Sequence, residues 1–167
     1  MILESERLLF RPHQPSDLDP YCAIEADPQV RRYVGGAPRT REAAEQKFRD
    51  GLPAASNPLS VRATIFKPEG CYIGRCGLHP NFGASGPLAH EAALAFYLDP
   101  QYWGRGLATE ASRVFIDYGF RELSLHRIVA LVQVGNAASI RVLEKLGFVW
   151  TARDEGVRCF DHYSLSP

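Results

Sequence analysis

The sequence predicts a single α/β domain, and three observations support this prediction. The 167 residues suffice for one hydrophobic core but not for two. Segments with the two-residue alternation of strands are interspersed with segments that have the helical spacing of apolar residues. Hydrophobic residues make up 46% and charged residues 23%, which is typical of globular proteins rather than disordered chains or coiled coils. We therefore expect one domain over residues 1–167.

The N-terminal half predicts one strand, two helices and a β-hairpin. In order, these are a strand over 6–11, a helix from 16 or 17 to 27, a helix over 41–49, and strands over 61–66 and 71–78. Pro12 and Pro15 end the first strand, and Thr40 is the N-cap expected for the second helix. The turn residues Lys67-Pro68-Glu69-Gly70 lie between the two later strands and favour a hairpin.

The C-terminal half predicts alternating strands and helices. After a loop over 81–87 rich in Gly, Ser and Pro come a strand over 92–98, a helix over 107–118, a strand over 127–134, a helix over 137–146, and strands over 149–151 and 157–165. Leu94, Phe96 and Leu98 share one face of their strand. Gly147 is a typical residue to end the second helix.

Composition excludes several classes of function. The 19 basic and 19 acidic side chains cancel, so no strong global field attracts nucleic acid or an anionic membrane. We expect no signal peptide, because residues 1–7 lack a basic region followed by an apolar run, and no apolar run approaches the roughly 20 residues that span a bilayer. The four cysteines and five histidines lack the spacing of metal ligands or of a disulfide scaffold. We expect a cytoplasmic protein with no metal, nucleic-acid or membrane partner.

The segment over 99–111 carries the most chemical information, because a strand ends there, glycines turn the chain and a helix starts. The first N–H groups of a helix have no internal partner and lie at the positive end of its dipole, so such a turn suits a phosphate or pyrophosphate. The dinucleotide pattern GxGxxG is broken by Thr109, and the Walker pattern is absent. The pattern present is Gln-x-x-Gly-x-Gly, formed by Gln101, Gly104 and Gly106.

That pattern, placed after an apolar strand, resembles the acetyl-CoA-binding signature of the GNAT acetyltransferase superfamily. Within it, the chain resembles the branch that acetylates the N-termini of ribosomal proteins at alanine or serine. The resemblance covers nearly the whole chain in the expected order, through Ser-Glu-Arg-Leu-x-x-Arg-Pro at 5–12, Asp-Pro-x-Val at 27–30, Tyr97 to Ala111, Asn136 to Phe148, and Asp-His-Tyr-Ser-Leu at 161–165.

The resemblance implies a specific architecture. It implies a central mixed, mostly antiparallel sheet of six to seven strands, flanked by about four helices. The strand ending at Leu98 and the strand starting near Arg127 would splay into a V, and acetyl-CoA would lie in this V. The pantetheine arm would then hydrogen-bond, like an added strand, to the backbone of residues 95–98, while the backbone of residues 103–108 would hold the pyrophosphate.

The resemblance also implies the coenzyme-binding residues. These are Tyr97, Leu98, Gln101, Trp103, Gly104, Arg105, Gly106, Leu107, Ala108, Asn136 and Ser139. Three of them have a plainer interpretation. Gln101 also fits an ordinary turn residue, Arg105 a solvated loop residue, and Asn136 a helix N-cap, a role compatible with contacting the coenzyme.

Ser139 lies where the family has a serine near the thioester sulfur, and we expect it to donate a proton or hydrogen bond to the departing thiolate. The family's usual glutamate base is replaced by Ala93. Glu91 lies two residues earlier, on the same face of an extended strand, and is our candidate base; Glu155 and Asp161 are rivals. We expect direct attack by the amine in a ternary complex, with backbone N–H groups polarising the thioester carbonyl.

The sequence does not decide the identity of the acceptor. The resemblance implies N-acetylation of a primary amine, which is either a protein N-terminus or a small molecule, by a monomer or homodimer. The acceptor site would use residues 30–38 and 79–87, with Tyr33, Phe82 and Tyr97. Loss of the glutamate at Ala93 motivates an alternative, a non-catalytic module that binds or senses acyl-CoA. A structural α/β domain with a fortuitous glycine turn is a third hypothesis.

Overall fold

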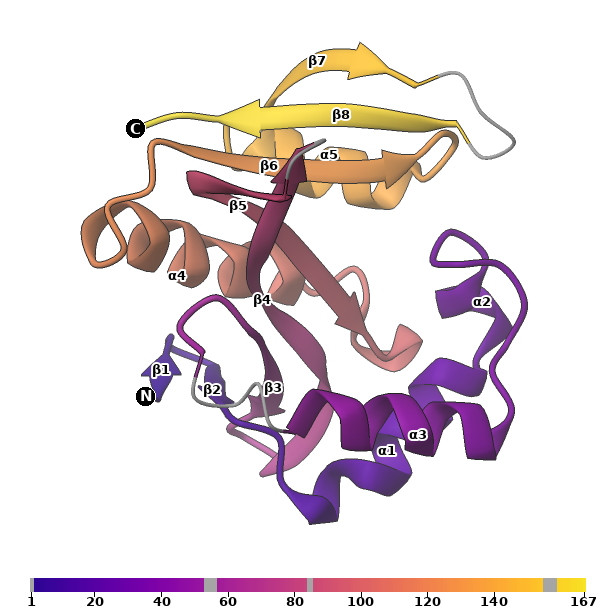
Figure 1. The fold of residues 1–167 in the computed structure, drawn as a ribbon. Coiled ribbons are helices and arrows are strands. Elements are labelled where there is room, and N and C mark those ends of the chain that lie inside the picture. Colours follow the sequence, from indigo (N-terminus) through magenta and orange to yellow (C-terminus); the bar gives the residue numbers. More distant parts are fainter. Residues whose placement is uncertain (1, 53–56, 84–85, 155–158) are drawn as a thin grey trace.

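The computed structural model describes residues 2–52, 57–83, 86–154 and 159–167. Its strands are β1 (Leu3–Glu4), β2 (Leu8–Arg11), β3 (Val61–Phe66), β4 (Cys71–Gly83), β5 (Gly86–Leu98), β6 (Arg127–Gln133), β7 (Val149–Arg153) and β8 (Phe160–Leu165). Its helices are α1 (Leu18–Ala26), α2 (Pro28–Arg31), α3 (Arg41–Gly51), α4 (Leu107–Arg121) and α5 (Ala137–Lys145), with 3₁₀ turns at Pro15–Asp17 and Pro100–Tyr102. Figure 1 shows these elements around one twisted sheet.

The strands form one eight-stranded sheet in the order β1-β2-β3-β4-β5-β6-β8-β7. β5 and β6 pair in parallel, and the other neighbours pair antiparallel, so the predicted mixed α/β fold is confirmed. The prediction of six to seven strands missed β1, which has two residues. The prediction of about four helices missed α2, a four-residue helix capped by the Asp27 side chain. Elements this short lack enough residues to show a period.

The predicted V between two central strands is present. β5 and β6 are in register from Glu91 opposite Arg127 to Ala93 opposite Val129. Beyond this short ladder β5 continues to Leu98, while β6 continues to Gln133 alongside β8. Figure 1 shows the two strands diverging toward their C-terminal ends. The C-terminal half of β5 therefore has β4 on one side and the opening of the V on the other.

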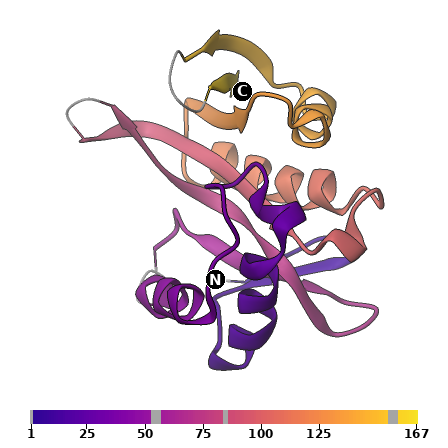
Figure 2. The ribbon, with the colours of Figure 1, turned by 90° about the vertical axis from the view of Figure 1, so that its right-hand side faces the viewer.

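The predicted loop over 81–87 is wrong for the described residues of that segment. β4 and β5 are each 13 residues long and stay paired to Phe82 opposite Pro87 and Gly83 opposite Gly86. Figure 2 shows this hairpin extending beyond the body of the sheet. Proline is tolerated at bulges and near strand ends, and the register shifts between Pro80 and Phe82. Cross-strand pairing therefore overrides a composition that is typical of loops.

Helices cover both faces of the sheet. α4 packs on the face that carries Leu78, and Phe115 of this helix lies edge-on to Phe10 of β2, with ring centroids 5.0 Å apart. Gly119 permits this packing, since a Cβ there would come within 2.9 Å of the Leu78 side chain. α1 and α3 cover the opposite face, where Arg75 of β4 meets α1. Leu78 and Arg75, three residues apart on β4, therefore point to opposite faces of the sheet.

Gly147 ends α5 as predicted. It is left-handed, with φ of +86°, and its N–H donates to the carbonyl of Glu144. The next N–H, of Phe148, donates to the carbonyl of Leu143, which completes a Schellman motif. In the described part of the chain, every helix is too short or too polar to cross a membrane.

Candidate active site

The turn that joins β5 to α4 contains two left-handed glycines. Gly104 and Gly106 have φ of +73° and +78°, values that favour glycine over other residues. A Cβ added at Gly104 would meet no atom within 4 Å, so the space around it is open. The glycines are thus explained by backbone conformation and leave room for a ligand to approach the chain.

The N-terminus of α4 is not capped by a side chain. Its N-cap residue is Gly106, whose carbonyl accepts from the N–H of Glu110 at 3.0 Å. The N–H groups of Leu107, Ala108 and Thr109 therefore have no partner within the helix. These groups and the positive end of the helix dipole provide a site suited to an anion.

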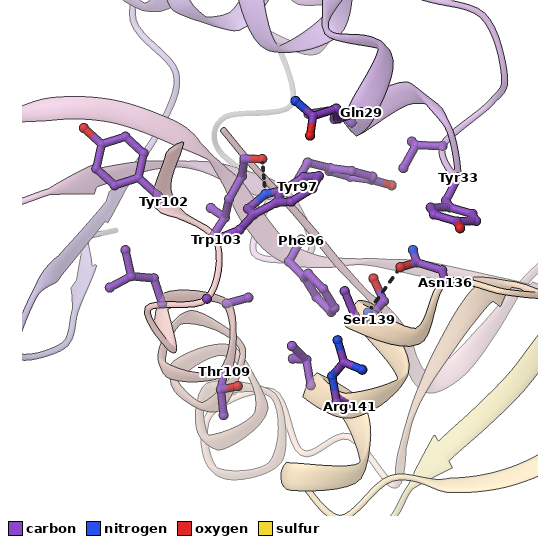
Figure 3. A pocket seen from close by; sticks show the side chains of 18 of the residues that line it. Gln29, Tyr33, Phe96, Tyr97, Tyr102, Trp103, Thr109, Asn136, Ser139 and Arg141 are labelled. Atoms are coloured by element: carbon purple, nitrogen blue, oxygen red, sulfur yellow. Dashed lines mark hydrogen bonds between the residues drawn. The ribbon is translucent and has the colours of Figure 1, made fainter. Parts of the chain in front are cut away.

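This helix N-terminus opens into a cavity of about 390 Å³ at the V. Figure 3 shows the cavity between β5, the glycine turn, the N-terminal part of α5 and the region of α2. Its lining residues are Gln29, Val30, Arg32, Tyr33, Val34, Phe96, Tyr97, Leu98, Tyr102, Trp103, Gly104, Gly106, Leu107, Ala108, Thr109, Asn136, Ala138, Ser139, Arg141, Val142 and Lys145.

The structure brings together most of the residues predicted to bind the coenzyme. Those that line the cavity are Tyr97, Leu98, Trp103, Gly104, Gly106, Leu107, Ala108, Asn136 and Ser139. Gln101 and Arg105 do not line it. Gln101 is exposed and its N–H donates to the Asp99 side chain. The guanidinium of Arg105 lies 4.9 Å from the centroid of the Phe66 ring, on the other side of the turn.

Backbone groups of β5 face the V at alternate residues. The N–H of Asp99 donates to the carbonyl of Ile73 and so faces β4. Because alternate residues of a strand present their backbone groups to the same side, Leu98 and Phe96 present theirs to the V. The Leu98 carbonyl already accepts a 2.8 Å hydrogen bond from the indole Nε1 of Trp103. The N–H of Leu98 and the backbone groups of Phe96 are the remaining candidates for strand-like pairing with a ligand.

Asn136 caps α5 and also lines the cavity. Its side-chain oxygen accepts from the N–H of Ser139 at 3.2 Å, an interaction drawn as a dashed line in Figure 3. Ser139 is half-buried and lies at the cavity wall one turn into the helix. The N-cap interpretation of Asn136 is therefore correct, and its position leaves contact with a ligand possible.

Two cations of α5 were missed from the sequence. Arg141 and Lys145 lie one helical turn apart and both line the cavity. The signal was available, since the core residue of this helix is Leu143 and residues 138, 141, 142 and 145 share a different face. Arg32 also lines the cavity, and since no acidic side chain of the described residues does, the wall carries net positive charge.

The comparison with known proteins decides the family. Residues 7–149 match the family model described as the acetyltransferase (GNAT) domain. The chain belongs to the GNAT acetyltransferase family. An uncharacterized N-acetyltransferase, p20, of Bacillus licheniformis is 33% identical over 87% of this chain and 81% of its own length.

Two further relatives differ in what their names say they acetylate. The ribosomal-protein-S5-alanine acetyltransferase from Vibrio fischeri has a similar fold, with a TM-score of 0.80 and 22% identity, over 99% of this chain and 96% of its own. The spermidine N(1)-acetyltransferase of Escherichia coli K12 is 39% identical over 58 residues, which are 35% of this chain and 31% of its own length.

The candidate base of this GNAT protein, Glu91, is held by two neighbours. Its carboxylate pairs with Arg127 at 2.8 Å and accepts from the side-chain amide of Asn81 at 2.9 Å. The hydrogen bond from Arg127 is the main cause that lowers the pKa of Glu91. Glu91 lies at the closed end of the V and does not line the cavity. This position argues against a role in deprotonating the acceptor.

Of the two rival bases, the described residues include Asp161. Asp161 is buried in β8, accepts from the indole of Trp150 at 3.0 Å and pairs with Arg153 at 2.8 Å. Glu155 lies outside the described residues. Phe82, an expected acceptor contact, is 65% exposed on the β4–β5 hairpin. Contact of Phe82 with an acceptor stays a prediction.

A second cavity of this GNAT domain lies on the face covered by α1 and α3. Tyr97 and Val34 line both cavities, so the two spaces meet at these residues. The guanidinium of Arg75 lies 4.4 Å from the centre of the Tyr97 ring and 4.8 Å from that of Tyr21. The second cavity is thus adjacent to the V, where an acceptor would have to approach the thioester.

Proposed function

We propose that this GNAT protein transfers the acetyl group of acetyl-CoA to a primary amine in a ternary complex. The observation that carries the proposal is the uncapped N-terminus of α4, which follows two left-handed glycines and opens into the cavity at the V. Its free N–H groups fit a pyrophosphate. The cations Arg141 and Lys145 on the facing helix add charge of the right sign.

Position and chemistry assign a role to Ser139 in this proposal. The neutral amine attacks the thioester carbonyl carbon, a C–N bond forms, and the C–S bond breaks. The Ser139 hydroxyl donates its proton to the departing sulfur. A water molecule then carries a proton back to Ser139 from the attacking nitrogen, which became positively charged when the C–N bond formed. The products are an N-acetylated amine and a free thiol, so atoms and charge balance.

A carboxylate base is not required by this scheme. The α-amino group of a protein N-terminus has a pKa of about 7.7–8.0, so a useful fraction is neutral near pH 7.5 without help, whereas a more basic small-molecule amine must first lose its proton to solvent. Ala93 occupies the position of the family glutamate and is buried. We propose that water accepts the amine proton, and that Glu91 stabilises the closed end of the V through Arg127.

The names of relatives support an amine acceptor without fixing its class. One relative is named for a ribosomal-protein alanine and another for spermidine. A protein N-terminus and a small-molecule amine are therefore both within the proposal. We also propose a cytoplasmic site of action, since the four cysteines are free thiols, as expected for a reducing compartment.

A free-thiol assay with acetyl-CoA and a panel of amines tests this function. We expect thiol release that depends on the amine, and a kcat of the Ser139→Ala variant lowered on the order of 100-fold or more. Its dissociation constant for acetyl-CoA should change less than about threefold, because the pyrophosphate site is intact. Tight acetyl-CoA binding without turnover of any amine would instead support the non-catalytic module.

A further inference from the structure

The second cavity has a marked excess of positive charge. The charged side chains that line it are Arg75 of β4, Lys47 of α3 and Arg62 of β3. Among the described residues, no aspartate or glutamate lines this cavity. His13 and His79 also line it, and burial together with the charge of Arg75 lowers the pKa of His13 to about 4. His13 is thus neutral at pH 7 and adds no charge to that of the cations.

The charge behind the cavity wall does not cancel this excess. The buried Glu25 carboxylate pairs with Arg75, with Arg31 at 3.2 Å and with Arg39 at 2.7 Å. Burial would raise the pKa of Glu25, but these arginines outweigh it and lower the pKa, so Glu25 is ionised. Three guanidinium groups therefore share one carboxylate, and the cluster retains net positive charge.

One donor of this cluster also lacks a partner. Arg75 is 7% exposed, and its Nη1 makes no hydrogen bond within the part of the chain that the structure describes. Its other terminal nitrogen donates to Glu25. Buried guanidinium nitrogens normally meet an acceptor oxygen, because leaving such a donor unpaired is costly. This nitrogen is itself shielded from the cavity, so a ligand there would meet the positive charge of the guanidinium rather than this donor.

The cluster lies next to the place of acetyl transfer. Tyr97 lines both cavities, and its ring stacks on the Arg75 guanidinium at 4.4 Å. A molecule that reaches the thioester past Tyr97 from the second cavity therefore carries its other end toward Arg75 and Lys47. The rings of Tyr21 and Phe48 form an apolar part of the same wall, which suits a compact organic group.

We infer that the acceptor is a small amine that also carries an anionic oxygen group, a carboxylate or a phosphonate, in the manner of an amino acid. This inference rests on the proposed function and narrows its acceptor. A polyamine such as spermidine would bring like charge to Arg75, Lys47 and Arg62, which disfavours its binding. A protein N-terminus carries no carboxylate close to its amine and so brings no counter-charge to these cations.

A matched acceptor panel tests the inference. The panel contains phenylalanine, its phosphonate analogue, phenylalaninamide, spermidine and an Ala-initiated tetrapeptide amide, each assayed for thiol release from acetyl-CoA. We expect kcat/KM for the carboxylate or phosphonate, expressed per concentration of neutral amine, to exceed that for the amide by about 10- to 100-fold, the range for hydrogen bonds to charged groups. Binding of each compound to the complex with coenzyme A is measured in parallel.

A charge reversal at the cavity rim provides the second test. Lys47→Glu should lower kcat/KM for the anionic acceptor by about fivefold or more and should not lower it for spermidine. Arg49→Glu is the matched control with the same change of charge, because Arg49 lies on the same helix and contacts Glu45 without lining either cavity. It should leave both values unchanged.

The outcomes separate this inference from the function on which it rests. Failure of wild type to bind acetyl-CoA contradicts the proposed function itself. Binding of acetyl-CoA with faster turnover of spermidine or of the tetrapeptide amide overturns the anionic acceptor and leaves the acetyltransferase intact. Binding of acetyl-CoA with neither turnover nor binding of any anionic compound also overturns it. Equal loss for all acceptors in Lys47→Glu contradicts the charge argument.

Discussion

The indole Nε1 of Trp103 donates a 2.8 Å hydrogen bond to the main-chain carbonyl of Leu98. This bond joins the start of the glycine turn to the last residue of β5. It fixes the turn relative to the strand, so that the N-terminus of α4 and the backbone of β5 both face one cavity. The bond also satisfies a carbonyl that the β4 ladder does not use.

Replacing Trp103 by phenylalanine tests the importance of this bond. The variant keeps an aromatic ring at a site that is 45% exposed but loses the donor. Loss of one hydrogen bond costs about 1 kcal/mol, so we expect the dissociation constant for acetyl-CoA to rise roughly fivefold. Calorimetry measures this, and the far-ultraviolet circular dichroism should be unchanged. An unaltered affinity would mean that the turn is positioned by other contacts.

Glu110 joins the N-terminal segment to α4. Its carboxylate accepts from the Ser5 hydroxyl at 2.7 Å and from the Arg7 N–H at 2.9 Å, and it pairs with the Arg7 guanidinium at 2.6 Å. These contacts explain why a glutamate stands at position 110, shortly after the glycine turn. Removal of the Glu110 carboxylate leaves the donors of Ser5 and Arg7 without their acceptor.

We predict that Glu110→Ala lowers the free energy of unfolding by about 2–4 kcal/mol. Burial would raise the pKa of Glu110, but Ser5 and Arg7 outweigh it and lower the pKa. Its contribution is therefore complete above the ordinary carboxyl pKa and is lost as the pH falls through the lowered value. Urea unfolding measures the change, with the exposed Glu144→Ala as control. A loss as small as that of the control would contradict this role.

Glu91→Gln tests whether this carboxylate is a base. Its oxygens are held by Arg127 and Asn81 at the closed end of the V, and its lowered pKa weakens it as a proton acceptor. We expect kcat to fall by less than about threefold, below the 10²–10⁴-fold typical of a lost general base. The pH–rate profile should keep its shape. A hundredfold fall with a shifted basic limb would restore Glu91 as the base.

His13 gives the fold a pH dependence of predictable sign. Burial, and then the charge of Arg75, lowers its pKa to about 4, below the ordinary value near 6.5. The unfolded chain then binds more protons than the folded one between these values, so stability falls as the pH drops through this window. Linkage gives a loss of about 2 kcal/mol between pH 7 and pH 5.

Urea unfolding of wild type and His13→Gln at pH 7 and pH 5 measures this contribution. Glutamine keeps a polar side chain beside the Tyr72 hydroxyl, which lies 3.4 Å from the His13 Nε2. The variant should lose less stability than wild type on acidification. Equal losses in the two proteins would show that His13 titrates normally in the folded state.

The sequence predicted those parts of the molecule whose structure is set by residues close to one another in the chain. The alternation at Leu94, Phe96 and Leu98 and the glycines at 104 and 106 are set by strand geometry and by backbone conformation. Both are properties of neighbouring residues. The V was predicted only from the resemblance to the GNAT family. It depends on where two strands separate, which no local pattern shows.

The rest depends on contacts between distant residues. The segment 81–87 has the composition of a loop, yet its described residues pair across a hairpin. Glu91 shares a strand face with Ala93, but pairing with Arg127, which is 36 residues away, decides what its carboxylate does. Arg75, Lys47 and Arg62 come from three separate elements, and only folding brings them to one cavity.

The central claim is that the N-terminus of α4 binds the pyrophosphate of acetyl-CoA, and calorimetric titration of wild type, Gly104→Glu and Gly70→Glu tests it most directly. Both glycines are left-handed, with φ of +73° and +64°, and an added Cβ meets no atom within 4 Å at either. The two variants therefore add the same charge at the same backbone strain. We predict tight binding by wild type and Gly70→Glu and its loss in Gly104→Glu. Equal affinity in all three proteins, or none in folded wild type, would contradict the account.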